Sequence, residues 1–313
     1  MKRMIASKEL AAQLHERFGD MVKENVLLAP YTSARIGGAA DIFITAGSVA
    51  ELERVVLYLW ESKTPFVTLG GGANILVSDQ GARGVVLFNR AKEVEFHLGD
   101  QPFVAAESGV VFSNLANRCA SKGLSGLEWS SAVPGTIGGA VYGNAGAFGG
   151  DIAGSLISAE LLTESGREKF SAEQMGYAYR SSVLKRGEVK AVVLSAELKL
   201  ENSTKEDVTA RIHQFVAHRK ATQPPGASMG SMFKNPSGDY AGRLIEVSGL
   251  KGARIGNAEI SQLHGNFFIN HGETRAEDIR ALIELARKTV QEKQGVDLEL
   301  EIEFVGDWQA ESD

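Results

Sequence analysis

The residues with the clearest chemical implication are the glycines of a stretch near the centre of the chain. Residues 133–150 read VPGTIGGAVYGNAGAFGG, in which seven of the eighteen residues are glycine and none carries a charge. Glycine inside a helix or strand costs roughly 0.5–1 kcal/mol relative to alanine, so an ordinary element is not built this way. Bare backbone lets amide N–H groups approach a bulky or anionic ligand closely. We therefore expect a ligand to lie against this stretch.

A second stretch of the same character runs from Leu69 to Gly84 and reads LGGGANILVSDQGARG. Two separated glycine-rich loops favour one extended ligand, such as a dinucleotide, held between two lobes; a pair of tight turns is the simpler alternative. The triple glycine is not the G-x-G-x-x-G fingerprint of nicotinamide-binding folds, which opens a helix and precedes an acidic residue by about twenty positions. Residues 75–79 instead predict a strand and a turn, so any phosphate here is held by loop amides without a helix dipole.

Charged side chains gather at two further places. The segment Leu298–Val305 alternates apolar and acidic residues, which predicts a half-buried strand with Glu299, Glu301 and Glu303 on one face. That face is either solvated or borders a site, where close carboxylates would raise one another's pKa. A basic run on and just beyond a predicted helix either binds phosphate or faces solvent. It consists of Arg211, His213, His218, Arg219 and Lys220.

Composition bounds the class of protein. A chain of 313 residues is too long for one small core, which predicts two or three domains. The net charge of −6 argues against a nucleic-acid surface. The single cysteine, Cys119, forms no internal disulfide and sets no zinc-ligand spacing, so we expect a reducing compartment and no metal site. There is no apolar run of signal-peptide length and none near the ~20 residues of a membrane span, which predicts a cytoplasmic protein.

The elements that position these residues follow from periodicity. In residues 1–90 we expect an amphipathic helix at 7–19 and a second helix that begins at the capping box Ser48–Glu51. Strands are expected at 41–45, 66–69 and 84–88. The order of these elements predicts a compact α/β lobe with the first glycine loop at a strand end.

Residues 91–203 are expected to form a second lobe. Its predicted helix is capped by Ser113 and ends at Gly123. The long glycine stretch follows this helix. The strands of this lobe are expected at 103–107, 156–163 and 191–200.

The character of the chain changes again near residue 204, so we predict a third α/β lobe at 204–313. It opens with a helix at 204–218, and a shorter helix is expected at 241–247. A capping box at Thr274–Glu277 predicts a further helix, which Gly295 ends. The alternating acidic strand closes the lobe.

Five stretches, in order along the chain, are similar to one known family. They read TSARIGGAADIFI, LGGGANILVSDQGARGVVL, GLEWSSAVPGTIGGAVYGNAGAFGG, YRSS and GSMFKNP. Together they resemble UDP-N-acetylmuramate dehydrogenase, also called UDP-N-acetylenolpyruvoylglucosamine reductase, a family of bacterial cell-wall synthesis. The resemblance implies an α+β protein with an FAD-binding fold of two α+β lobes, of the vanillyl-alcohol-oxidase type. A C-terminal α/β substrate domain follows these lobes in the family.

The resemblance also implies a reaction, the reduction of UDP-N-acetylglucosamine enolpyruvate to UDP-N-acetylmuramate for peptidoglycan precursor synthesis. NADPH reduces FAD and leaves, and the reduced flavin passes hydride to the vinyl carbon of the substrate. Negative charge then builds on the adjacent carbon and its carboxylate, so the site needs a cation at the carboxylate and a proton donor. We expect a cytoplasmic monomer with no nucleic-acid or membrane partner.

The resemblance implies three catalytic residues, two in the last two motifs and one near the C-terminus. Ser231, in GSMFKNP, matches the proton donor, Arg180 matches the arginine that holds the substrate carboxylate, and Glu301 matches the catalytic glutamate. The chain departs from the family pattern at Leu300 and Glu303, where proline and arginine are usual. Glu301 is selected by its spacing to the glycine that follows. The implied substrate-binding residues are Tyr179, Asn235 and His264.

The implied cofactor residues lie in the two glycine stretches. The first stretch matches the loop for the FAD pyrophosphate, and the second is expected to pack along the flavin and its ribityl chain. The residues are Gly70, Gly71, Gly72, Ala73 and Asn74, followed by Pro134, Gly135, Thr136, Gly138, Gly139, Asn144, Ala145 and Gly146. The basic run that contains Arg219 is either the UDP diphosphate site or a solvated face.

Other interpretations stay open on the sequence. The chain is either this reductase, another flavin-dependent oxidoreductase acting on an alcohol or sugar, or a non-catalytic nucleotide-sugar binder. The pair of Ser231 and Arg180 favours the reductase, because a simple alcohol oxidase has no reason to keep it. Taken singly, Ser231 also fits a turn-capping serine, His264 a structural histidine and Lys234 a solvated lysine.

Overall fold

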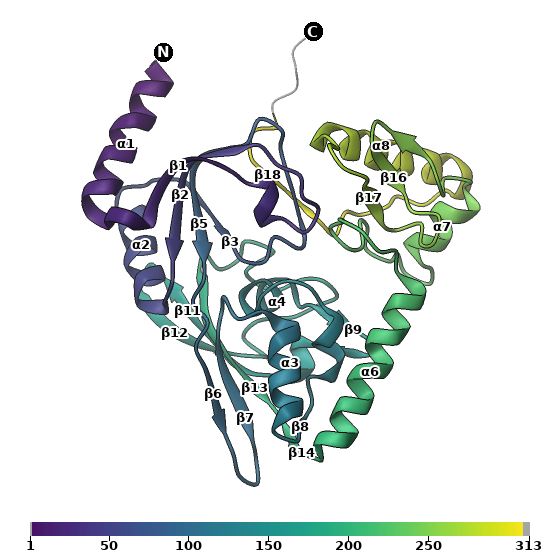
Figure 1. Cartoon of the computed structure of the whole chain (residues 1–313), viewed down its shortest axis with the longest axis horizontal. Coiled ribbons are helices and arrows are strands. Elements are labelled where there is room, and N and C mark those ends of the chain that lie inside the picture. Colours follow the sequence, from purple (N-terminus) through teal and green to yellow (C-terminus); the bar gives the residue numbers. More distant parts are fainter. Residues whose placement is uncertain (1, 309–313) are drawn as a thin grey trace.

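The computed structural model describes residues 2–308, which form three lobes (Figure 1). The first lobe contains helices α1 (Lys2–Phe18) and α2 (Val49–Glu61). Its strands are β1 (Val22–Leu27), β2 (Ala39–Ala46), β3 (Phe66–Leu69), β4 (Ile75–Val77) and β5 (Ala82–Asn89). Four of them form a mixed sheet in the order β1-β2-β5-β3, in which only the β1–β2 pair is antiparallel.

The first lobe forms where its sequence pattern predicts it. The Ser48 hydroxyl caps α2 by accepting a hydrogen bond from the Glu51 amide at 3.2 Å, as the capping box predicts. The apolar stripe of α2 is buried and consists of Leu52, Val55, Val56 and Leu59. These side chains share a cluster with Leu162 and Leu194 of the second lobe. The first two lobes therefore pack on one another through a common core.

The second lobe is built on an antiparallel sheet in the order β12-β11-β13-β7-β6. These strands are β6 (Val94–His97), β7 (Phe103–Glu107), β11 (Leu156–Thr163), β12 (Gly166–Ser171) and β13 (Val192–Lys199). Shorter elements are α3 (Phe112–Ser121), α4 (Ile137–Gly143), α5 (Ile152–Ser155), β8 (Leu124–Ser125), β9 (Gly146–Ala147), β10 (Gly150–Asp151) and β14 (Glu201–Asn202). The predicted cap at Ser113 is wrong, because α3 begins one residue earlier and the Val111 carbonyl accepts its first hydrogen bond.

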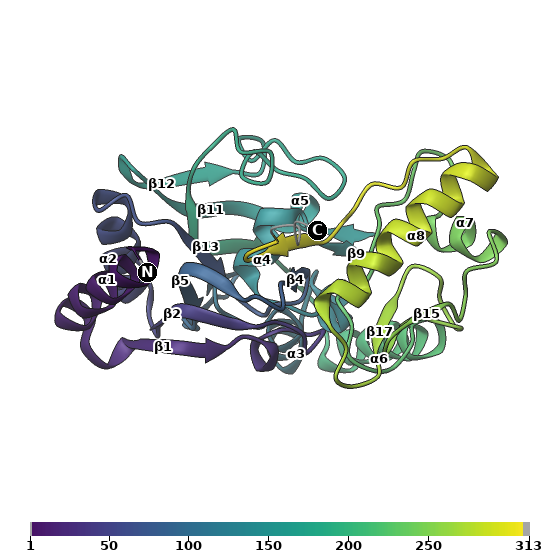
Figure 2. The ribbon, with the colours of Figure 1, turned by 90° about the horizontal axis from the view of Figure 1, so that it is seen from above.

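The third lobe is reached through the long helix α6 (Lys205–Thr222), which rises along the second lobe (Figure 1). Its remaining helices and strands are α7 (Ala241–Val247), α8 (Ala276–Gln294), β15 (Arg254–Ile255), β16 (Ala258–Ile260), β17 (Phe268–Asn270) and β18 (Glu303–Val305). Helix α8 covers the small sheet β15-β16-β17 (Figure 2). The buried residues Val208 and Ile212 of α6 lie in the cluster of the second lobe. The boundaries at 90/91 and 203/204 stay predictions.

Helix α8 begins in a way that the sequence did not predict. Its N-cap is Arg275, one residue after the predicted cap Thr274. The Asp278 carboxylate accepts from the Arg275 amide at 3.1 Å. Asp79, from the first lobe, accepts from the amides of Ala276 at 2.8 Å and of the next residue at 3.2 Å. The first lobe therefore satisfies two of the four free N–H groups with which any helix begins.

The single strand predicted at 298–305 is also wrong, because this segment changes partners halfway. Its first half runs beside residues 232–234: the Lys234 amide donates to the Glu299 carbonyl at 2.8 Å, and the Glu301 amide donates to the Met232 carbonyl at 3.0 Å. Its second half, β18, pairs in parallel with β4 of the first lobe. The change of partner breaks the alternation, so Phe304 is exposed although its position in the pattern predicts burial.

Mixed α+β character is confirmed, and the last helix of the third lobe buries an apolar stripe. The buried stripe of α8 consists of Ile279, Leu282, Ile283, Ala286 and Val290, and Gly295 ends the helix with φ of 70°. Within residues 2–308, no helix has the length and apolar character needed to cross a membrane.

Substitution of Asp79 by alanine tests the capping contact between lobes. We expect Asp79→Ala to lower the free energy of unfolding by about 1 kcal/mol, because two amides at the start of α8 lose their acceptor. Asp79→Asn keeps one acceptor oxygen and should lose less. The measurement is urea unfolding followed by circular dichroism. Asp100→Ala, at an exposed aspartate, is the control and should stay within about 0.5 kcal/mol. Equal losses at both positions would contradict the contact.

Candidate active site

The two glycine-rich stretches meet backbone to backbone. A Cβ on Gly71 would lie 2.7 Å from Cα of Gly135, and a Cβ on Gly70 would lie 2.4 Å from Oγ1 of Thr136. Neither approach leaves room for a side chain, so glycine is required for the loops to touch. The contact between the two glycine-rich loops is therefore also a contact between the first and second lobes.

Free amide groups line the first loop. The N–H groups of Gly71, Gly72, Ala73 and Asn74 donate no hydrogen bond to any group of the described chain. Gly72 has φ of 58°, and a Cβ there would lie 2.2 Å from the Tyr31 carbonyl oxygen. Consecutive free N–H groups on a turn form an anion-binding concavity. The first loop therefore presents unpaired amide donors, which close backbone packing holds in place.

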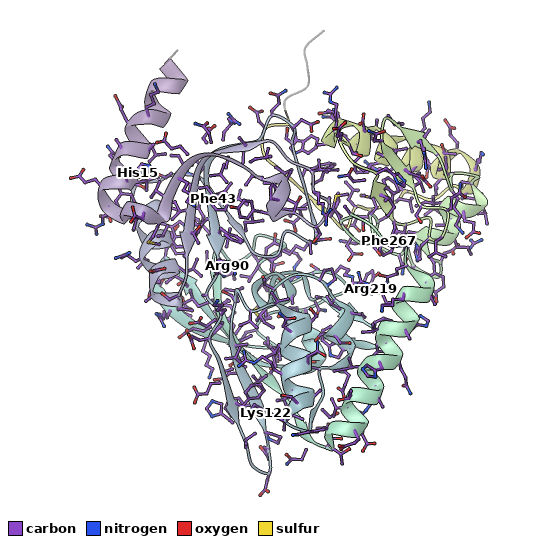
Figure 3. The ribbon with its side chains drawn as sticks, in the orientation of Figure 1. His15, Phe43, Arg90, Lys122, Arg219 and Phe267 are labelled. Atoms are coloured by element: carbon purple, nitrogen blue, oxygen red, sulfur yellow. The ribbon has the colours of Figure 1, made fainter. Side chains whose placement is uncertain are left out.

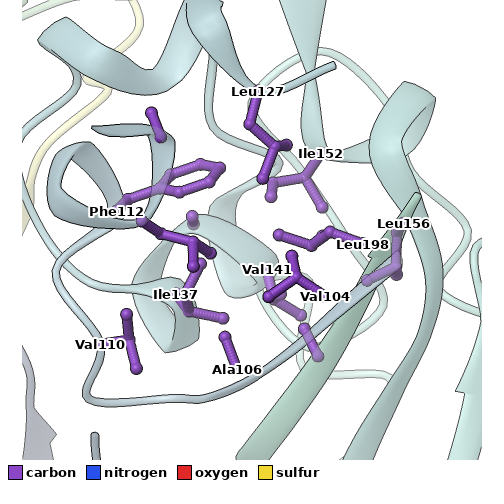
Figure 4. Packing of buried hydrophobic residues seen from close by; sticks show 14 of the residues in the cluster. Val104, Ala106, Val110, Phe112, Leu127, Ile137, Val141, Ile152, Leu156 and Leu198 are labelled. Atoms are coloured by element: carbon purple, nitrogen blue, oxygen red, sulfur yellow. The ribbon is translucent and has the colours of Figure 1, made fainter. Parts of the chain in front are cut away.

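Helix α4 carries the second stretch into the site. Its residues Ile137 and Val141 point into the hydrophobic cluster of the second lobe (Figure 4). Gly138 packs against Ser108, where a Cβ would lie 3.0 Å from the serine Cβ. Gly139 differs, because a Cβ there meets nothing within 4 Å. One edge of α4 is thus bare and open, whereas the other edges are packed.

Asn144 and Gly146, two of the predicted cofactor residues, have structural partners. Asn144 ends α4 in the left-handed region, with φ of 48°. Its side chain donates to the Ala178 carbonyl at 3.0 Å and accepts from the Ala153 amide at 2.9 Å. Gly146 allows the approach of Asp151, whose Cβ would lie 2.8 Å from an added Cβ. Packing within the second lobe therefore explains both residues.

The predicted catalytic residues Arg180 and Glu301 are brought together. The Arg180 Nε atom lies 2.9 Å from Oε1 of Glu301, an ion-pair contact whose angles fall outside those of a hydrogen bond. The Arg180 side chain is 23% exposed and that of Glu301 14%. Arg180 has φ of 54°, a left-handed conformation that costs a non-glycine residue free energy and is concentrated at functional sites.

Burial raises the pKa of the Glu301 carboxyl, and the nearby cations Arg180, Lys185 and Lys234 partly oppose this shift. The three glutamates of this segment do not form one face. Glu299 is 72% exposed and Glu303 40%, against 14% for Glu301. The expectation that neighbouring carboxylates raise the pKa is therefore wrong in its cause, because desolvation is the main cause. The strand change after Glu301 turns this side chain inward.

Ser231 lies beside the same segment. It pairs as an isolated antiparallel bridge with Phe267, and the next residue, Met232, accepts from the Glu301 amide. The Ser231 side chain is half-buried and has no hydrogen-bond partner among the described residues. A hydroxyl held in this way does not cap a turn, so the simpler interpretation of Ser231 loses its basis.

Tyr179 and Asn235, two of the predicted substrate residues, come close together across lobes. The Asn235 amide donates to the Tyr179 hydroxyl at 3.5 Å, and the Asn235 side chain accepts from the Ala241 amide at the start of α7. His264 is held by its own segment, where Nδ1 accepts from the Asn266 amide at 3.2 Å and burial lowers its pKa. The His264 ring packs 5.0 Å from that of Phe267, the partner of Ser231.

The basic run does not form one solvated face. Arg211 pairs with Glu128 at 3.2 Å, and His218 packs edge-on against Phe148 at 5.7 Å. Arg219 is half-buried, and burial lowers its pKa. Within residues 2–308 its guanidinium has neither an ion pair nor a hydrogen bond. Figure 3 places Arg219 near the end of α6 at which the chain passes to the third lobe, below Phe267 of that lobe.

Three residues contribute to the site in ways that the sequence did not predict. Asn74 was expected only at the cofactor, but its Nδ2 also donates to the Glu301 carbonyl at 3.0 Å, and its carbonyl accepts from the Glu303 amide at 3.0 Å. Lys185 lies five residues after Arg180, and its Nζ atom approaches the Glu301 carbonyl and the Glu303 carboxylate. Lys234 pairs with Glu299 and is not the solvated lysine expected. Lys185 could have been predicted from the segment YRSSVLK, because a lysine so close to Arg180 in the sequence lies on the same loop.

The free amides of the first loop fit the pyrophosphate of a dinucleotide, and the bare edge of α4 fits its flat ring. These features, with the fold, define the class of protein as an FAD-dependent oxidoreductase. Residues 40–169 match the family model described as an FAD binding domain. Residues 221–305 match the model described as UDP-N-acetylenolpyruvoylglucosamine reductase, C-terminal domain. The predicted two-lobe cofactor fold with a C-terminal domain is confirmed.

The particular family follows from similarity along the whole chain. The UDP-N-acetylenolpyruvoylglucosamine reductase of Chloroflexus aggregans is 43% identical over 291 residues, which cover 91% of this chain and 97% of that protein. The Bacillus subtilis reductase of the same name is 39% identical, covering 96% and 99%. The crystal structure of the Thermus caldophilus reductase has a TM-score of 0.74 and 36% identity, covering 90% and 97%. The chain belongs to the UDP-N-acetylenolpyruvoylglucosamine reductase family.

A pair of glycine substitutions separates the packed glycines from the open one. We expect Gly139→Ala not to lower the unfolding midpoint of the FAD-free protein, and to raise it slightly because alanine favours the helix, but to weaken FAD binding about tenfold or more, because its methyl group enters the open edge of α4. Gly71→Ala should lower the unfolding midpoint itself, because its Cβ meets the Gly135 backbone. Thermal unfolding and flavin fluorescence titration measure the two effects. Unchanged FAD affinity in Gly139→Ala would contradict the assignment.

Proposed function

We propose that Arg180, Ser231 and Glu301 carry out the family's reaction on UDP-N-acetylglucosamine enolpyruvate, with Tyr179, Asn235 and His264 lining the substrate pocket. Membership of the family brings reductase activity in peptidoglycan precursor synthesis, with FAD and NADPH as its cofactors. The observation that carries the proposal is the buried Arg180–Glu301 pair, whose glutamate is hydrogen-bonded through its backbone to the residue next to Ser231.

The cofactor has a place beside these residues. We assign the pyrophosphate of FAD to the free amides of the first loop and the flavin to the open edge of α4 at Gly139. When bound, FAD would supply the chemistry of hydride transfer from NADPH to the vinyl carbon of the enolpyruvyl group. What remains for the protein is to hold the substrate carboxylate, to stabilise the charge that develops beside it, and to supply one proton.

Arg180 holds the substrate carboxylate in this proposal. An arginine fork can make two parallel hydrogen bonds to a carboxylate, and the interaction strengthens as negative charge grows on it. The left-handed backbone of Arg180 and its contact with Glu301 support a fixed orientation. A preoriented cation costs little reorganisation during the reaction.

Glu301 acts as an acid at the same place in this proposal. Burial raises the pKa of its carboxyl, so the protonated form persists to higher pH and can donate a hydrogen bond to the developing enolate. The ion pair with Arg180 opposes this protonation. A substrate carboxylate that takes over the arginine would remove that opposition and leave Glu301 as an acid.

Ser231 gives the proton to the carbon next to the carboxylate. A serine hydroxyl is a weak acid, so it can act only toward a strongly basic carbanion-like centre in a preorganised site. Its hydroxyl has no partner among the described residues, which leaves it free for this task. Ser231 is thus the proton donor, whereas Arg180 and Glu301 act on the charge.

The two half-reactions separate the role of Ser231 from cofactor binding. We expect Ser231→Ala to be reduced by NADPH within about twofold of the unsubstituted rate, whereas reoxidation by the enolpyruvyl substrate slows by about 10²–10⁴-fold. Anaerobic stopped-flow absorbance of the flavin measures both rates. The control is Ser237→Ala, at an exposed serine of the same segment, which should leave both rates unchanged. Near-normal reoxidation in Ser231→Ala would remove this residue from the mechanism.

Arg219 is the member of the basic run that we assign to the UDP diphosphate. It is half-buried and without a partner within residues 2–308, whereas Arg211 already has Glu128. A desolvated guanidinium gains most from an anion that supplies charge-assisted hydrogen bonds. Arg219 lies at the end of α6 next to the third lobe, a suitable place for the diphosphate that is attached to the bound sugar of the substrate.

Neutralising Arg219 tests this assignment. We expect Arg219→Gln to raise the KM for the enolpyruvyl substrate about tenfold or more, because a charge-assisted hydrogen bond is worth about 1.5–3 kcal/mol. Bound FAD per chain should not change. His213→Gln, at an exposed position of α6, is the control and should leave KM unchanged. Loss of FAD with an unaltered KM would assign Arg219 to the cofactor and contradict the proposal.

We further propose that the reductase acts as a cytoplasmic monomer. Its nucleotide substrate and NADPH are cytoplasmic metabolites, and the single cysteine suits a reducing compartment. The three lobes already supply every residue assigned to the site from one chain.

A further inference from the structure

Lys185 is a buried cation at the site that the mechanism above does not use. Its side chain is only 16% exposed. Its Nζ atom donates to the Glu301 carbonyl at 3.3 Å and lies 3.5 Å from Oε1 of Glu303. Its own amide donates to the Ser182 hydroxyl at 3.2 Å. A lysine so enclosed has lost rotamer freedom and solvation, so these contacts must repay that loss.

The Glu301 backbone is held from three directions. Its carbonyl accepts from Lys185 Nζ and from Asn74 Nδ2, and its amide donates to the Met232 carbonyl. These partners belong to the second, first and third lobes respectively. Arg180 and Lys185 lie on one loop, five positions apart, so this loop holds both the carboxylate and the carbonyl of Glu301.

Glu303 completes the arrangement around Lys185. One oxygen faces Lys185, and the other accepts from the Tyr142 hydroxyl at 3.4 Å. Burial and the charge of Glu303 raise the pKa of Tyr142 to about 12, so this hydroxyl stays protonated and able to donate. The Tyr142 carbonyl in turn accepts from the Ser182 hydroxyl at 2.6 Å. Lys185 is thereby fixed between α4 and the C-terminal strand.

We propose that Lys185 is a positioning residue for the reductase reaction, which holds the Glu301 backbone so that its carboxyl meets Arg180. The proposal rests on the proposed function. Among the described residues, Lys185 makes no hydrogen bond or ion pair with the cofactor loop or with Ser231, so it acts on the reaction through the segment of Glu301 and Glu303. Removal of its side chain leaves the carbonyl with Asn74 as its remaining donor, so the segment can shift within the site. A misplacement of about 1 Å is enough to cost roughly 10²-fold in rate.

The charges around Glu301 give this role a signature in the pH profile. Arg180, Lys185 and Lys234 favour the carboxylate, while burial disfavours it; Glu299 and Glu303 are the acids on the same segment, and Tyr142 is neutral. Removing Lys185 removes one of the three cations, so the pKa of Glu301 rises further. The protonated carboxyl then persists to higher pH. The limb on which the rate falls with rising pH must move upward.

The experiment uses the FAD-loaded full chain and three variants. Lys185→Met removes the charge and Lys185→Arg keeps it. The control is Lys190→Met, because Lys190 is an exposed lysine shortly before β13 that pairs with Glu164. Reduction by NADPH and reoxidation by the enolpyruvyl substrate are followed separately by anaerobic stopped flow across pH 5–9. Lys185→Gln replaces the methionine variant if the latter does not fold.

We expect Lys185→Met to slow reoxidation roughly 10- to 100-fold, with reduction by NADPH within twofold, and to move the alkaline limb upward by about one pH unit. Lys185→Arg should return the limb to its place, and Lys190→Met should change nothing. An unmoved limb, or equal losses in both half-reactions, would overturn the proposal in favour of a merely structural lysine. Failure of the unsubstituted protein to reoxidise with this substrate would instead refute the proposed function.

Discussion

Two hydrogen bonds between Asn74 and the C-terminal strand hold the site together. The Asn74 side chain donates to the Glu301 carbonyl, 227 positions away in the chain, and the Asn74 carbonyl accepts from the Glu303 amide, each at 3.0 Å. Parallel pairing of β18 with β4 continues from these bonds. The loop assigned to the cofactor and the segment of Glu301 are therefore fixed to one another.

Burial of one glutamate among three follows from the same constraint. The segment pairs first with residues 232–234 and then with β4, and Glu301 lies where it passes from one to the other. Because the pleat is broken there, its side chain turns toward Arg180 whereas Glu299 and Glu303 stay closer to solvent. Desolvation then raises the Glu301 pKa and the surrounding cations limit the rise. Protonation is thus set by backbone topology as much as by neighbouring charge.

Local features of the fold could be read from the sequence, and contacts between lobes could not. The helix stripes, the strands at 66–69 and 103–107, and the end of α8 at Gly295 depend on periodicity and on nearby caps. The start of α8 depends on Asp79, which lies about two hundred positions away, so Thr274 was mistaken for its cap. Periodicity likewise predicted one continuous strand around Glu301, because the change of the pairing partner within this segment leaves no signal in the local sequence.

At the site, the resemblance selected Arg180 and Glu301, which the structure brings together, but it gave neither the contact between them nor its burial. The glycine loops were recognised as bare backbone, and the structure adds that part of this bareness lets one loop pass the other at Gly71 and Gly135. Gly139 and Gly143, both on α4, instead have open space at the Cβ position. Asn144 was included for its place in the motif, although its side chain serves the second lobe. Composition alone does not distinguish a glycine needed for packing from one needed for a ligand.

The packing of α6 has a topological consequence. This helix is fastened to the second lobe by Val208, Ile212 and the stacking of Phe215 on Phe148, while Ala34, Ile36 and Leu76 of the first lobe enter the core of the third. The chain thereby closes a ring around Glu301, with each lobe anchored to the other two. The third lobe therefore has no unattached side about which it could rotate as a rigid body. Any opening of the third lobe must break one of its two anchorages or bend the connection after Thr222, where α6 ends.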